Sequence, residues 1–390
     1  MNGRRVAITG LGVVATCGTG IDAFWDGLCV ASAEGEKTVE FDPADWYDNP
    51  KEARRADRAT QFAMAAATQA IDDAGGIHGD PARNGVIFAT GVGGMSTFED
   101  QVEVYLNKGA RRVSPFMIPM MMPNAAGAAI SMNWGLQGPN ETICTACAAG
   151  THAIGNAARL IAMGRCDTVV TGGCESVMTK VGVAGFGNMT ALSSVGISRP
   201  FDAERDGFMM TEGAGVLVLE EWDHAVARGA TIYAELLGAG SNADAHHITA
   251  PSPGGVGAVA CMQLAIDDAG LNAEDIVHVN AHGTSTPLND AAEAQAMAKL
   301  FGEPGPIVTS IKGVTGHGLG AAGAIEAVSL VLSIDKALVP PTVNFTTLDP
   351  ELPTIDVVKD VPREWTPGPS LSNNFGFGGH NGTICIGPPT

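Results

Sequence analysis

Residues Cys144–Ile161 read CTACAAGTHAIGNAARLI, and residues Val314–Leu332 read VTGHGLGAAGAIEAVSLVL. Each stretch has the pattern of a turn of small residues that leads into a helix. When the two stretches are superposed, Cys147 falls opposite His317. The pair therefore predicts a duplicated unit, which would place two reactive side chains at matched turns around one pseudo-twofold axis. Chance similarity between two helices rich in Ala and Gly is the alternative interpretation.

The rest of the chain alternates short apolar runs with helical patterns, which predicts βαβ units and parallel or mixed sheets covered by helices. A chain of 390 residues exceeds what one hydrophobic core usually organises, so two fused halves are expected. No linker rich in Pro, Ser or charge separates them, and we place the boundary near Ala227–Thr231, which gives halves of residues 1–229 and 230–390. Helices are expected over Ile21–Cys29 and Thr60–Asp73, and strands over Val6–Thr9, Gly85–Ala89, Thr168–Thr171, Gly215–Glu220, Val277–Asn280 and Ile307–Thr309.

The composition disfavours several classes of function. A formal net charge of −20 argues against nucleic acid as a partner, because phosphate binding requires a concentrated basic surface, and only 5% of the residues are aromatic. No apolar stretch of the sequence reaches the roughly 20 residues needed to span a bilayer, so no membrane partner is expected. The first residues lack the pattern of a secretory signal, and eight scattered cysteines indicate reduced thiols rather than a disulfide framework. We therefore expect a cytoplasmic protein.

Two short basic stretches are candidates for contact with an acidic protein partner. One contains Lys51, Arg54, Arg55 and Arg58, and the other contains Lys108, Arg111 and Arg112. Solvated charges on helices and loops are an equally good interpretation of either stretch taken alone.

Four residues stand where reactive groups are expected. Cys147 lies in TACAAG, just before a helical pattern, and the N–H groups at a helix N-terminus favour a thiolate. His282 directly follows the expected strand Val277–Asn280, and open α/β sheets place their ligands at such strand ends. Lys312 and His317 share IKGVTGHGLG, which again leaves a strand and enters a helix. A lone cysteine or loop histidine is usually structural, but these four residues in similar settings favour a catalytic site.

Three further features are candidates for substrate contacts. Thr284 and Thr286 alternate along the loop after the first histidine and are suited to hydrogen-bonding an extended polar arm. Phe375 and Phe377 stand between glycines in SNNFGFGGHNG, which suits either a gate or a plug in the core. The methionine-rich run Met117–Met122 indicates an adaptable apolar surface, which is usually core but also suits a flexible acyl chain.

Two other motifs point to different functions. Residues 10–15 read GLGVVA and fit the fingerprint of a dinucleotide-binding turn. The acidic residues at the required distance, Glu34 and Glu36, lie in a polar stretch rather than at the end of a second strand, which weighs against that function. Cys144 and Cys147 match the dithiol motif C-x-x-C, but no Trp or Pro context accompanies them. We expect Cys144 to pack as a small residue in a strand.

Together these motifs resemble those of the β-ketoacyl-acyl carrier protein synthases of the elongating type, synthases I and II, within the thiolase fold. The segments TACAAGTHAIG, SRPFDAERDGF, NAHGTSTPLND, IKGVTGHGLGAAGAIE and NNFGFGGHNG occur in the order of that family. The resemblance extends from ITGLGVV near the N-terminus to FGFGGHNG near the end of the chain. It implies an α/β, thiolase-like fold of five layers, αβαβα, built from two pseudo-symmetric halves.

The reaction implied by the resemblance is a decarboxylative Claisen condensation. An acyl thioester on Cys147 would react with malonyl-acyl carrier protein, which lengthens fatty acyl or related chains by two carbons. The implied partner is acyl carrier protein, which brings its own phosphopantetheine, and the enzyme itself needs neither a metal nor a cofactor. We expect a homodimer, or a heterodimer with a chain-length factor if the chain is the ketosynthase of a type II polyketide or polyene synthase. A chain-length factor itself is disfavoured, because such subunits lack the nucleophile.

The resemblance also implies roles for individual residues. Cys147 would accept the acyl chain, while His282 and His317 would donate hydrogen bonds to the malonyl thioester oxygen. Lys312 would orient the histidines and pair with Glu326. The other implied roles are support of the site by Asp290 and Glu293, gating and oxyanion contacts by Phe375 and Phe377, pantetheine binding by Thr284 and Thr286, and an acyl pocket lined by Val92, Met117 and Met120.

The chain departs from the family pattern at several places. Thr211 and Asn289 occupy positions where the family often has glycine, and His380 replaces a frequent threonine. The segments 40–58 and 193–199 are shorter than usual, and both lie near surfaces that meet the carrier protein in the family. These departures leave the pathway and the choice of partner open.

Overall fold

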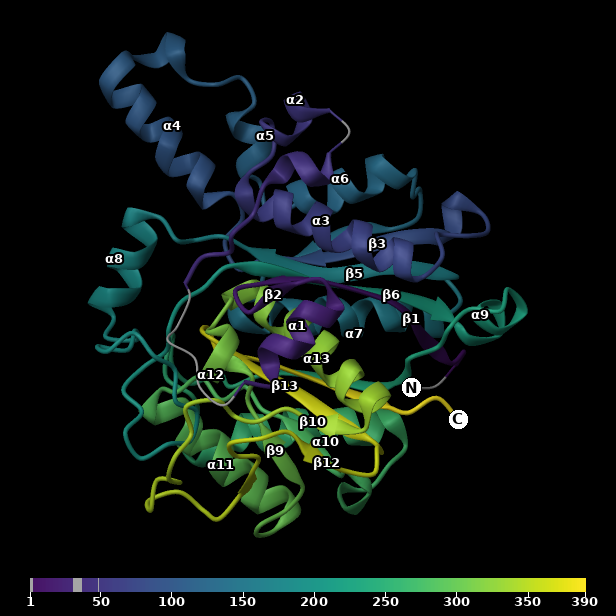
Figure 1. The fold of residues 1–390 in the computed structure, drawn as a ribbon, viewed down its shortest axis with the longest axis vertical. Coiled ribbons are helices and arrows are strands. Elements are labelled where there is room, and N and C mark those ends of the chain that lie inside the picture. The colour runs from purple at the N-terminus through teal and green to yellow at the C-terminus, as the bar shows by residue number, and fades with distance from the viewer. Residues whose placement is uncertain (1–2, 31–36, 48) are drawn as a thin grey trace.

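The computed structural model describes residues 3–30, 37–47 and 49–390 (Figure 1). Its strands are β1 (Val6–Ala15), β2 (Gly18–Thr19), β3 (Asn84–Ala89), β4 (Asn140–Ile143), β5 (Thr168–Glu175), β6 (Gly213–Glu221), β7 (Ala234–Ala243), β8 (His278–Asn280), β9 (Ile307–Thr309), β10 (Leu338–Val339), β11 (Asp356–Val357), β12 (Arg363–Glu364), β13 (Ser370–Gly376) and β14 (His380–Gly387). Its α-helices are α1 (Ile21–Leu28), α2 (Pro50–Ala53), α3 (Arg58–Asp73), α4 (Met95–Lys108), α5 (Met117–Met121), α6 (Ala125–Trp134), α7 (Ala149–Ala162), α8 (Lys180–Asn188), α9 (Trp222–Ala227), α10 (Val256–Ala269), α11 (Pro287–Phe301), α12 (Lys312–Thr315) and α13 (Ala322–Lys336). The helices and strands predicted above are present, and β1 and β5 extend further than expected.

Eleven of these strands form a continuous path in the order β11-β9-β8-β13-β14-β7-β1-β6-β5-β3-β4, while β2 pairs with β1 off the path and β10 pairs with β12 in a separate sheet. At its centre β1 and β7 pair antiparallel, with Ala7 opposite Glu235 and Ile8 opposite Ala234. Outward from that junction, β1-β6-β5-β3-β4 and β7-β14-β13-β8-β9 repeat one pattern, two antiparallel pairings followed by two parallel ones. The repeated pattern confirms the prediction of two pseudo-symmetric halves.

The helices complete five layers (Figure 1). On the N-terminal half, α3 packs on β1 and β6, and α6 packs on β3. On the C-terminal half, α10 packs on β7 and β14 and also contacts α11. Between the two sets of strands lie α7, which contacts both β5 and β14, and α13, which contacts both β6 and β13. This order is the αβαβα arrangement that the resemblance implied.

The two central helices approach each other closely because small residues line their crossing. A Cβ placed on Gly150 would lie 2.7 Å from the backbone nitrogen of Ala324, and one placed on Gly323 would lie 2.2 Å from Oγ1 of Thr151. Every residue of α13 from Ala322 to Ile334 is buried. The abundance of Ala and Gly in both stretches therefore reflects close packing of their backbones.

The duplicated turns differ in register from the superposition made on sequence. Ala146 and Leu319 both have positive φ, 51° and 47°, and each begins a one-turn 3-10 helix that leads directly into α7 or α13. Cys147 therefore corresponds to Gly320, and His317 lies before the turn, so the predicted match of Cys147 with His317 is wrong. The reason is that Ala and Gly dominate the turn and the first residues of both helices, so the sequence offers little there to fix one alignment.

The glycines of the apparent dinucleotide fingerprint serve packing. Gly10 and Gly12 lie inside β1 rather than in a turn, and a Cβ on Gly12 would lie 1.9 Å from the carbonyl oxygen of Ala66 in α3. The dinucleotide interpretation is therefore wrong, and the acidic residues considered for it, Glu34 and Glu36, lie outside the described residues. Among the helices of the described ranges, none combines the length and apolar character needed to cross a membrane.

Candidate active site

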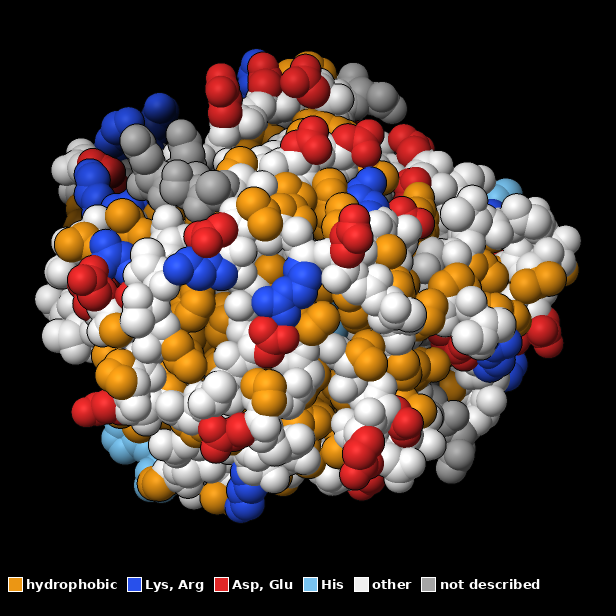
Figure 2. Space-filling model, turned by 60° about the horizontal axis from the view of Figure 1, so that its bottom comes forward, with side chains coloured by type: hydrophobic (Ala, Val, Ile, Leu, Met, Phe, Trp, Pro, Cys, Tyr) orange, Lys and Arg blue, Asp and Glu red, His pale blue; other side chains and the backbone are white. Residues whose placement is uncertain are grey.

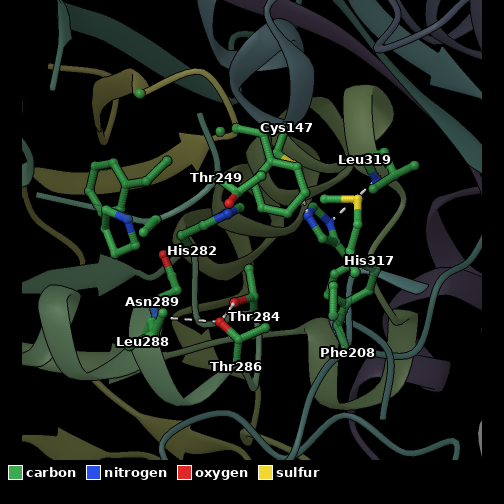
Figure 3. Close-up of a pocket in the computed structure, with 18 of the residues that line it drawn as sticks. Cys147, Phe208, Thr249, His282, Thr284, Thr286, Leu288, Asn289, His317 and Leu319 are labelled. Atoms are coloured by element: carbon green, nitrogen blue, oxygen red, sulfur yellow. Dashed lines mark hydrogen bonds between the residues drawn. The ribbon is translucent and has the colours of Figure 1, made fainter. Parts of the chain in front are cut away.

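A cavity of about 520 Å³ is lined by residues of both halves (Figure 3). Its lining includes Cys147, Phe186, Phe208, His282, Thr284, Thr286, Asn289, His317, Leu319, Phe375 and Phe377. Three of the four residues expected to be catalytic therefore share one cavity, although they come from segments far apart in the sequence.

Cys147 lies in the 3-10 turn between β4 and α7, and only 7% of its surface is exposed. Its Sγ is 3.1 Å from Nε2 of His317, and the backbone N–H of Phe377 donates toward the same sulfur. Burial raises the pKa of the Cys147 thiol to about 11, although Lys312 and the N–H of Phe377 act in the opposite direction. The loss of solvent around the sulfur thus outweighs the nearby donors, and the thiol form is favoured over the thiolate that the helix start suggested.

Both cavity histidines are neutral donors. Burial, reinforced by Lys312, lowers the pKa of His282 and of His317 well below the usual value. Nδ1 of His317 lies 3.3 Å from the backbone nitrogen of Leu319, and Nδ1 of His282 lies 3.0 Å from the amide nitrogen of Asn374. Because these partners donate, Nδ1 accepts in each ring and the ring proton is on Nε2. Nε2 is thus the donor that each ring can offer to the cavity.

The same three side chains have the composition of a metal site, but their surroundings do not fit one. Potential ligand atoms of Cys147, His282 and His317 all lie within 4.8 Å of one another. A histidine that binds a cation through Nε2 must carry its proton on Nδ1, usually donated to a carbonyl or carboxylate. Here Nδ1 of both rings faces N–H donors. The donor set therefore disfavours a cation.

A buried ion pair lies behind His282. The side chain of Lys312 is fully buried, and its Nζ donates to Glu326 and, at 2.6 Å, to the backbone oxygen of His282. Burial raises the pKa of Glu326, while Lys312 and Asn374 act in the opposite direction. The structure thus contains the pairing of Lys312 with Glu326 that the resemblance implied. Such a pair is costly to break, because the remaining charge would be buried alone.

The two supporting carboxylates hold the loop that carries His282. Glu293 accepts from the backbone N–H groups of His282 and Gly283, both at 2.8 Å. Asp290 accepts from the backbone N–H of Ser285 at 3.1 Å. Burial raises the pKa of Asp290 to about 6 and that of Glu293 to about 7, and the N–H donors oppose this effect. Both carboxylates lie on the buried side of α11 and fix the loop through its backbone.

The threonines and phenylalanines lie where the sequence suggested. Thr284 and Thr286 line the cavity side by side, with 2.9 Å between their hydroxyl oxygens (Figure 3). Phe377 stacks on Phe186 with 6.5 Å between ring centroids, and Phe375 meets the ring of His282 edge to face at 6.0 Å. The two aromatic residues of the glycine-rich loop thus form part of the cavity wall.

The packing expected for Cys144 is wrong, whereas the acyl pocket stays a prediction. Val92, Met117 and Met120 do not line the cavity described above, and Val92 is 46% exposed in the single chain. The run that contains the methionines forms the short surface helix α5 instead of a core segment. Cys144 is exposed and follows the end of β4, where its thiol contacts the backbone oxygen of Gly91.

Sequence reasoning missed two buried polar residues, Asn374 and Glu175. Asn374 contacts His282 and Glu326. Glu175 ends β5 and accepts from the backbone N–H of Gly91 at 2.6 Å and of Gly320 at 3.1 Å. Burial raises its pKa to about 7. A sequence signal existed for both: Glu175 is a carboxylate that ends a largely apolar strand, and Asn374 directly precedes the glycine-rich segment FGFGG.

The five layers, the two similar halves and the cavity between them define a thiolase-like fold. Family models named β-ketoacyl synthase, N-terminal domain and C-terminal domain, match residues 30–225 and 233–346. The chain belongs to the β-ketoacyl synthase family.

Known proteins of this family are similar over their whole length. The chain is 42% identical to 3-oxoacyl-[acyl-carrier-protein] synthase 2 of Synechocystis sp., with 98% of both chains covered. Among solved structures, the ishigamide ketosynthase/chain length factor gives a TM-score of 0.92 at 32% identity, with 100% of both chains covered. A type II polyketide ketosynthase bound to its acyl-carrier protein gives 0.91 at 30% identity, again with 100% of both chains covered.

Proposed function

We propose that this protein is an elongating β-ketoacyl-acyl carrier protein synthase. It joins an acyl group held on Cys147 to the two-carbon unit of a malonyl thioester, with loss of CO2. The observation that carries the proposal is the arrangement of three side chains. The buried thiol of Cys147 lies 3.1 Å from Nε2 of His317, and the ring centroids of His317 and the neutral His282 are 5.3 Å apart. The family of the chain supports the same class of reaction.

In the first half-reaction, the sulfur of Cys147 attacks the carbonyl carbon of an acyl thioester on the carrier. The carbon–sulfur bond to the carrier breaks, and the thiol proton leaves with the carrier's sulfur. The backbone N–H groups of Cys147 and Phe377 would stabilise the oxyanion. Gly376 supports this role, because a Cβ there would lie 3.0 Å from the nitrogen of Cys147, so only glycine lets the two segments come so close.

In the second half-reaction, the carbon–carbon bond to the malonyl carboxylate breaks and CO2 leaves. The electron pair forms an enolate, whose oxygen would accept from Nε2–H of His282 and His317. One well-placed donor of this kind lowers the activation barrier by roughly 3–4 kcal/mol. The enolate carbon then attacks the acyl carbonyl on Cys147, and the sulfur leaves as a thiolate that takes up a proton from water. All bonds balance without a redox cofactor or a metal.

The cavity wall suggests how the substrate arm is held. The hydroxyl groups of Thr284 and Thr286 would bind the phosphopantetheine arm that the carrier protein brings. Phe377 would move between the acylation and condensation steps, since it lies between two glycines and its ring stacks on the partly buried Phe186. Asn289 lines the cavity at the first turn of α11 and donates to Asp290.

An acyl carrier protein, an acidic partner, would bind at the two basic stretches. Arg55 of the first stretch lies beside the segment that follows the second stretch, because its guanidinium carbon is 4.4 Å from the ring centroid of Phe116, four residues after exposed Arg112. Arg58 is not available, because it forms an ion pair with buried Glu212. On the face drawn in Figure 2, basic side chains occur in small separate groups among acidic and apolar ones, so a carrier protein needs such a local cluster.

The assembly would be a homodimer. The edge strand β4 ends the sheet path, and exposed edge strands and apolar patches mark interaction surfaces. Large apolar side chains are exposed on and around α4, α5 and α6, namely Phe98, Val102, Tyr105, Leu106, Phe116, Ile118, Met122 and Met132. A second copy that pairs along β4 would cover this surface.

A cytoplasmic location fits this function. All eight cysteines are free in the structure, and four of those outside the cavity are buried: Cys166, Cys174, Cys261 and Cys385. Reduced thiols of this kind are typical of a reducing compartment.

The alternative function is a ketosynthase of a type II polyketide or polyene pathway that works with a chain-length factor, and the likeness to the ishigamide ketosynthase/chain length factor favours it. Intact-protein mass spectrometry with a series of acyl-carrier-protein thioesters separates the two. A saturated acyl adduct that malonyl carrier protein then elongates supports the proposed function. Loading of polyene or short ketide chains alone, or only after a second subunit is added, would overturn it in favour of the alternative.

A further inference from the structure

Asn374 lies at the centre of the buried polar network behind His282. It belongs to β13 and is fully buried. Its amide nitrogen donates to Oε2 of Glu326 at 2.8 Å and to Nδ1 of His282 at 3.0 Å, which uses both amide hydrogens. Its Oδ1 accepts from the hydroxyl of Thr151. The side chain is thus fully hydrogen-bonded, and the reaction described above assigns it no role.

The neighbours of Asn374 fix the orientation of its amide. The carboxylate of Glu326, paired with Lys312, can only accept, so the amide atom that faces it is the nitrogen. The hydroxyl of Thr151 can donate to the oxygen on the other side. The same orientation places an N–H, not a carbonyl, against Nδ1 of His282.

Asn374 is also the nearer of the two donors to that ring nitrogen. Nζ of Lys312 lies 3.3 Å from Nδ1 of His282 and is engaged more closely by Glu326 and by the backbone oxygen of His282, at 2.6 Å. Lys312 thus supplies charge to the network, whereas Asn374 supplies the shorter hydrogen bond to the ring.

The packing of the two central helices leaves room for this amide. A Cβ on Gly323 would lie 2.3 Å from Oδ1 of Asn374 and 2.2 Å from Oγ1 of Thr151. Any other residue at this position of α13 would displace the Thr151 hydroxyl or the amide. The crossing of α7 and α13 therefore holds Asn374 from the side opposite His282.

We infer that Asn374 is a positioning residue for the condensation step, which holds His282 as the tautomer that carries its proton on Nε2. The inference rests on the proposed function, in which that proton is donated to the enolate oxygen. Without the amide, only the more distant Nζ of Lys312, at 3.3 Å, would face Nδ1, and the ring could carry its proton there instead. Nε2 would then present a lone pair to the enolate oxygen and repel it.

The test measures the two half-reactions separately in Asn374→Leu, a substitution of similar shape that removes both donors. Acylation of Cys147 is followed by intact mass, and decarboxylation by release of labelled CO2 from malonyl carrier protein. We expect decarboxylation to fall about 100-fold, the effect of losing one oxyanion donor, while acylation changes less than about threefold. Asn374→Gln should recover part of the decarboxylation rate. Asn84→Leu, which replaces another buried asparagine outside the cavity, controls for a general loss of packing.

A second measurement is the pH dependence of decarboxylation, which should not change if Asn374 has a purely structural role. Loss of the amide N–H against Nδ1 makes protonation of His282 easier, and a charged ring would repel Lys312 and disturb the buried network that holds it. The acid limb of the decarboxylation rate should therefore shift to higher pH in Asn374→Leu. If Asn374→Leu does not fold, Thr151→Val, which frees the amide to rotate, should show the same shift with a smaller loss of rate. Equal losses in both half-reactions, or an unshifted acid limb, would overturn the inference. A wild-type protein that neither acylates nor decarboxylates would instead refute the proposed function.

Discussion

The turn before α7 in the N-terminal half and the turn before α13 in the C-terminal half have the same backbone and different contents. Each begins with a residue of positive φ, Ala146 or Leu319, and the next residue is Cys147 in one and Gly320 in the other. A Cβ on Gly320 would lie 2.0 Å from the backbone nitrogen of Gly91, so the second turn has no room for any side chain. Duplication therefore supplied two equivalent turns, and packing allows a nucleophile in only one of them.

The polar residues show the complementary difference. In the C-terminal half, four residues form a connected, buried network: His282 after β8, Asn374 in β13, Lys312 on α12 and Glu326 on α13. At the equivalent strand ends of the N-terminal half, Glu175 binds backbone N–H groups instead of a buried cation. The N-terminal half thus provides the thiol, and the C-terminal half provides the groups that handle developing charge.

The largest expected effect comes from removing the thiol of the N-terminal turn. Cys147→Ala should abolish acyl transfer to the protein and leave the fold intact, because Ala is smaller than Cys and the turn is otherwise built from alanines. Intact-protein mass spectrometry after incubation with acyl carrier protein thioesters measures the loss. Cys144→Ala is the matched control, since that thiol is exposed and should leave acylation unchanged. An acyl adduct on the Cys147→Ala protein would show that the nucleophile lies elsewhere.

A smaller and more selective effect is expected in the C-terminal half. His317→Ala should slow malonyl decarboxylation by about 100- to 1,000-fold, the usual cost of one oxyanion donor. Acylation should suffer less, because the oxyanion of that step faces the backbone N–H groups of Cys147 and Phe377, and of the groups in that step His317 contacts only the sulfur, at 3.1 Å. Single-turnover acylation and CO2 release, measured on the same preparation, give the two rates. If both rates fell by the same factor, the division of labour between the halves would be wrong.

The buried ion pair predicts an effect on stability that the N-terminal half should not share. Lys312→Met leaves Glu326 buried without its cation and should destabilise the protein by about 3–5 kcal/mol. Lys312→Met combined with Glu326→Leu should regain most of that stability but not the condensation activity. Chemical denaturation of the three proteins checks the order. A double variant as unstable as the single one would mean that the pair stabilises the fold in its own right.

The parts of this site that the sequence could predict are those that depend on local structure. Cys147 and His282 each stand at a strand end or helix start that periodicity and glycines reveal. Their convergence in one cavity followed from the resemblance. The alternation of strands and helices also predicts that strands such as β3 and β8 run parallel to their neighbours. The fold class could therefore be predicted from the sequence.

The failures involve long-range structure. The register of the two turns depends on how α7 and α13 cross, and Val92 is exposed because α4 and α5 lie over the surface instead of the core. The pKa of Cys147 is set by burial from both halves, which the helix start in the sequence does not reveal. The contact of Asn374 with His282 could not be predicted, because the sequence does not show which strand lies against that histidine.

The smallest expected effect concerns equivalent strands, β3 and β8, which both begin with a buried polar residue. Asn84 begins β3, and its amide donates to the backbone oxygen of His78 at 3.0 Å. His278 begins β8, and among the described residues neither of its ring nitrogens has a hydrogen-bond partner. Burial lowers the pKa of His278 to about 3. The folded protein therefore resists a proton that the unfolded chain readily binds.

The sign of the pH dependence follows from this lowered pKa. Above pH 6.5, the usual pKa of the group, both states are neutral and full stability is present. As the pH falls below that value, the unfolded chain gains a proton, and stability drops by about 1.4 kcal/mol per pH unit, or about 2 kcal/mol by pH 5. The variant His278→Phe removes this titration and keeps an aromatic ring against Trp365. The stability difference between variant and wild type should therefore shift by about 2 kcal/mol in favour of the variant between pH 7.5 and pH 5.

Denaturant unfolding at the two pH values measures this shift. The contributions of the other buried histidines to the pH dependence cancel, because both proteins contain them. Asn84→Leu is the matched control in the N-terminal half: it changes a buried polar residue that does not titrate, so its effect on stability should be the same at both pH values. A constant difference for His278→Phe as well would mean that the folded protein accommodates the charged imidazole. The equivalent strands of the two halves would then differ in sequence but not in their response to acid.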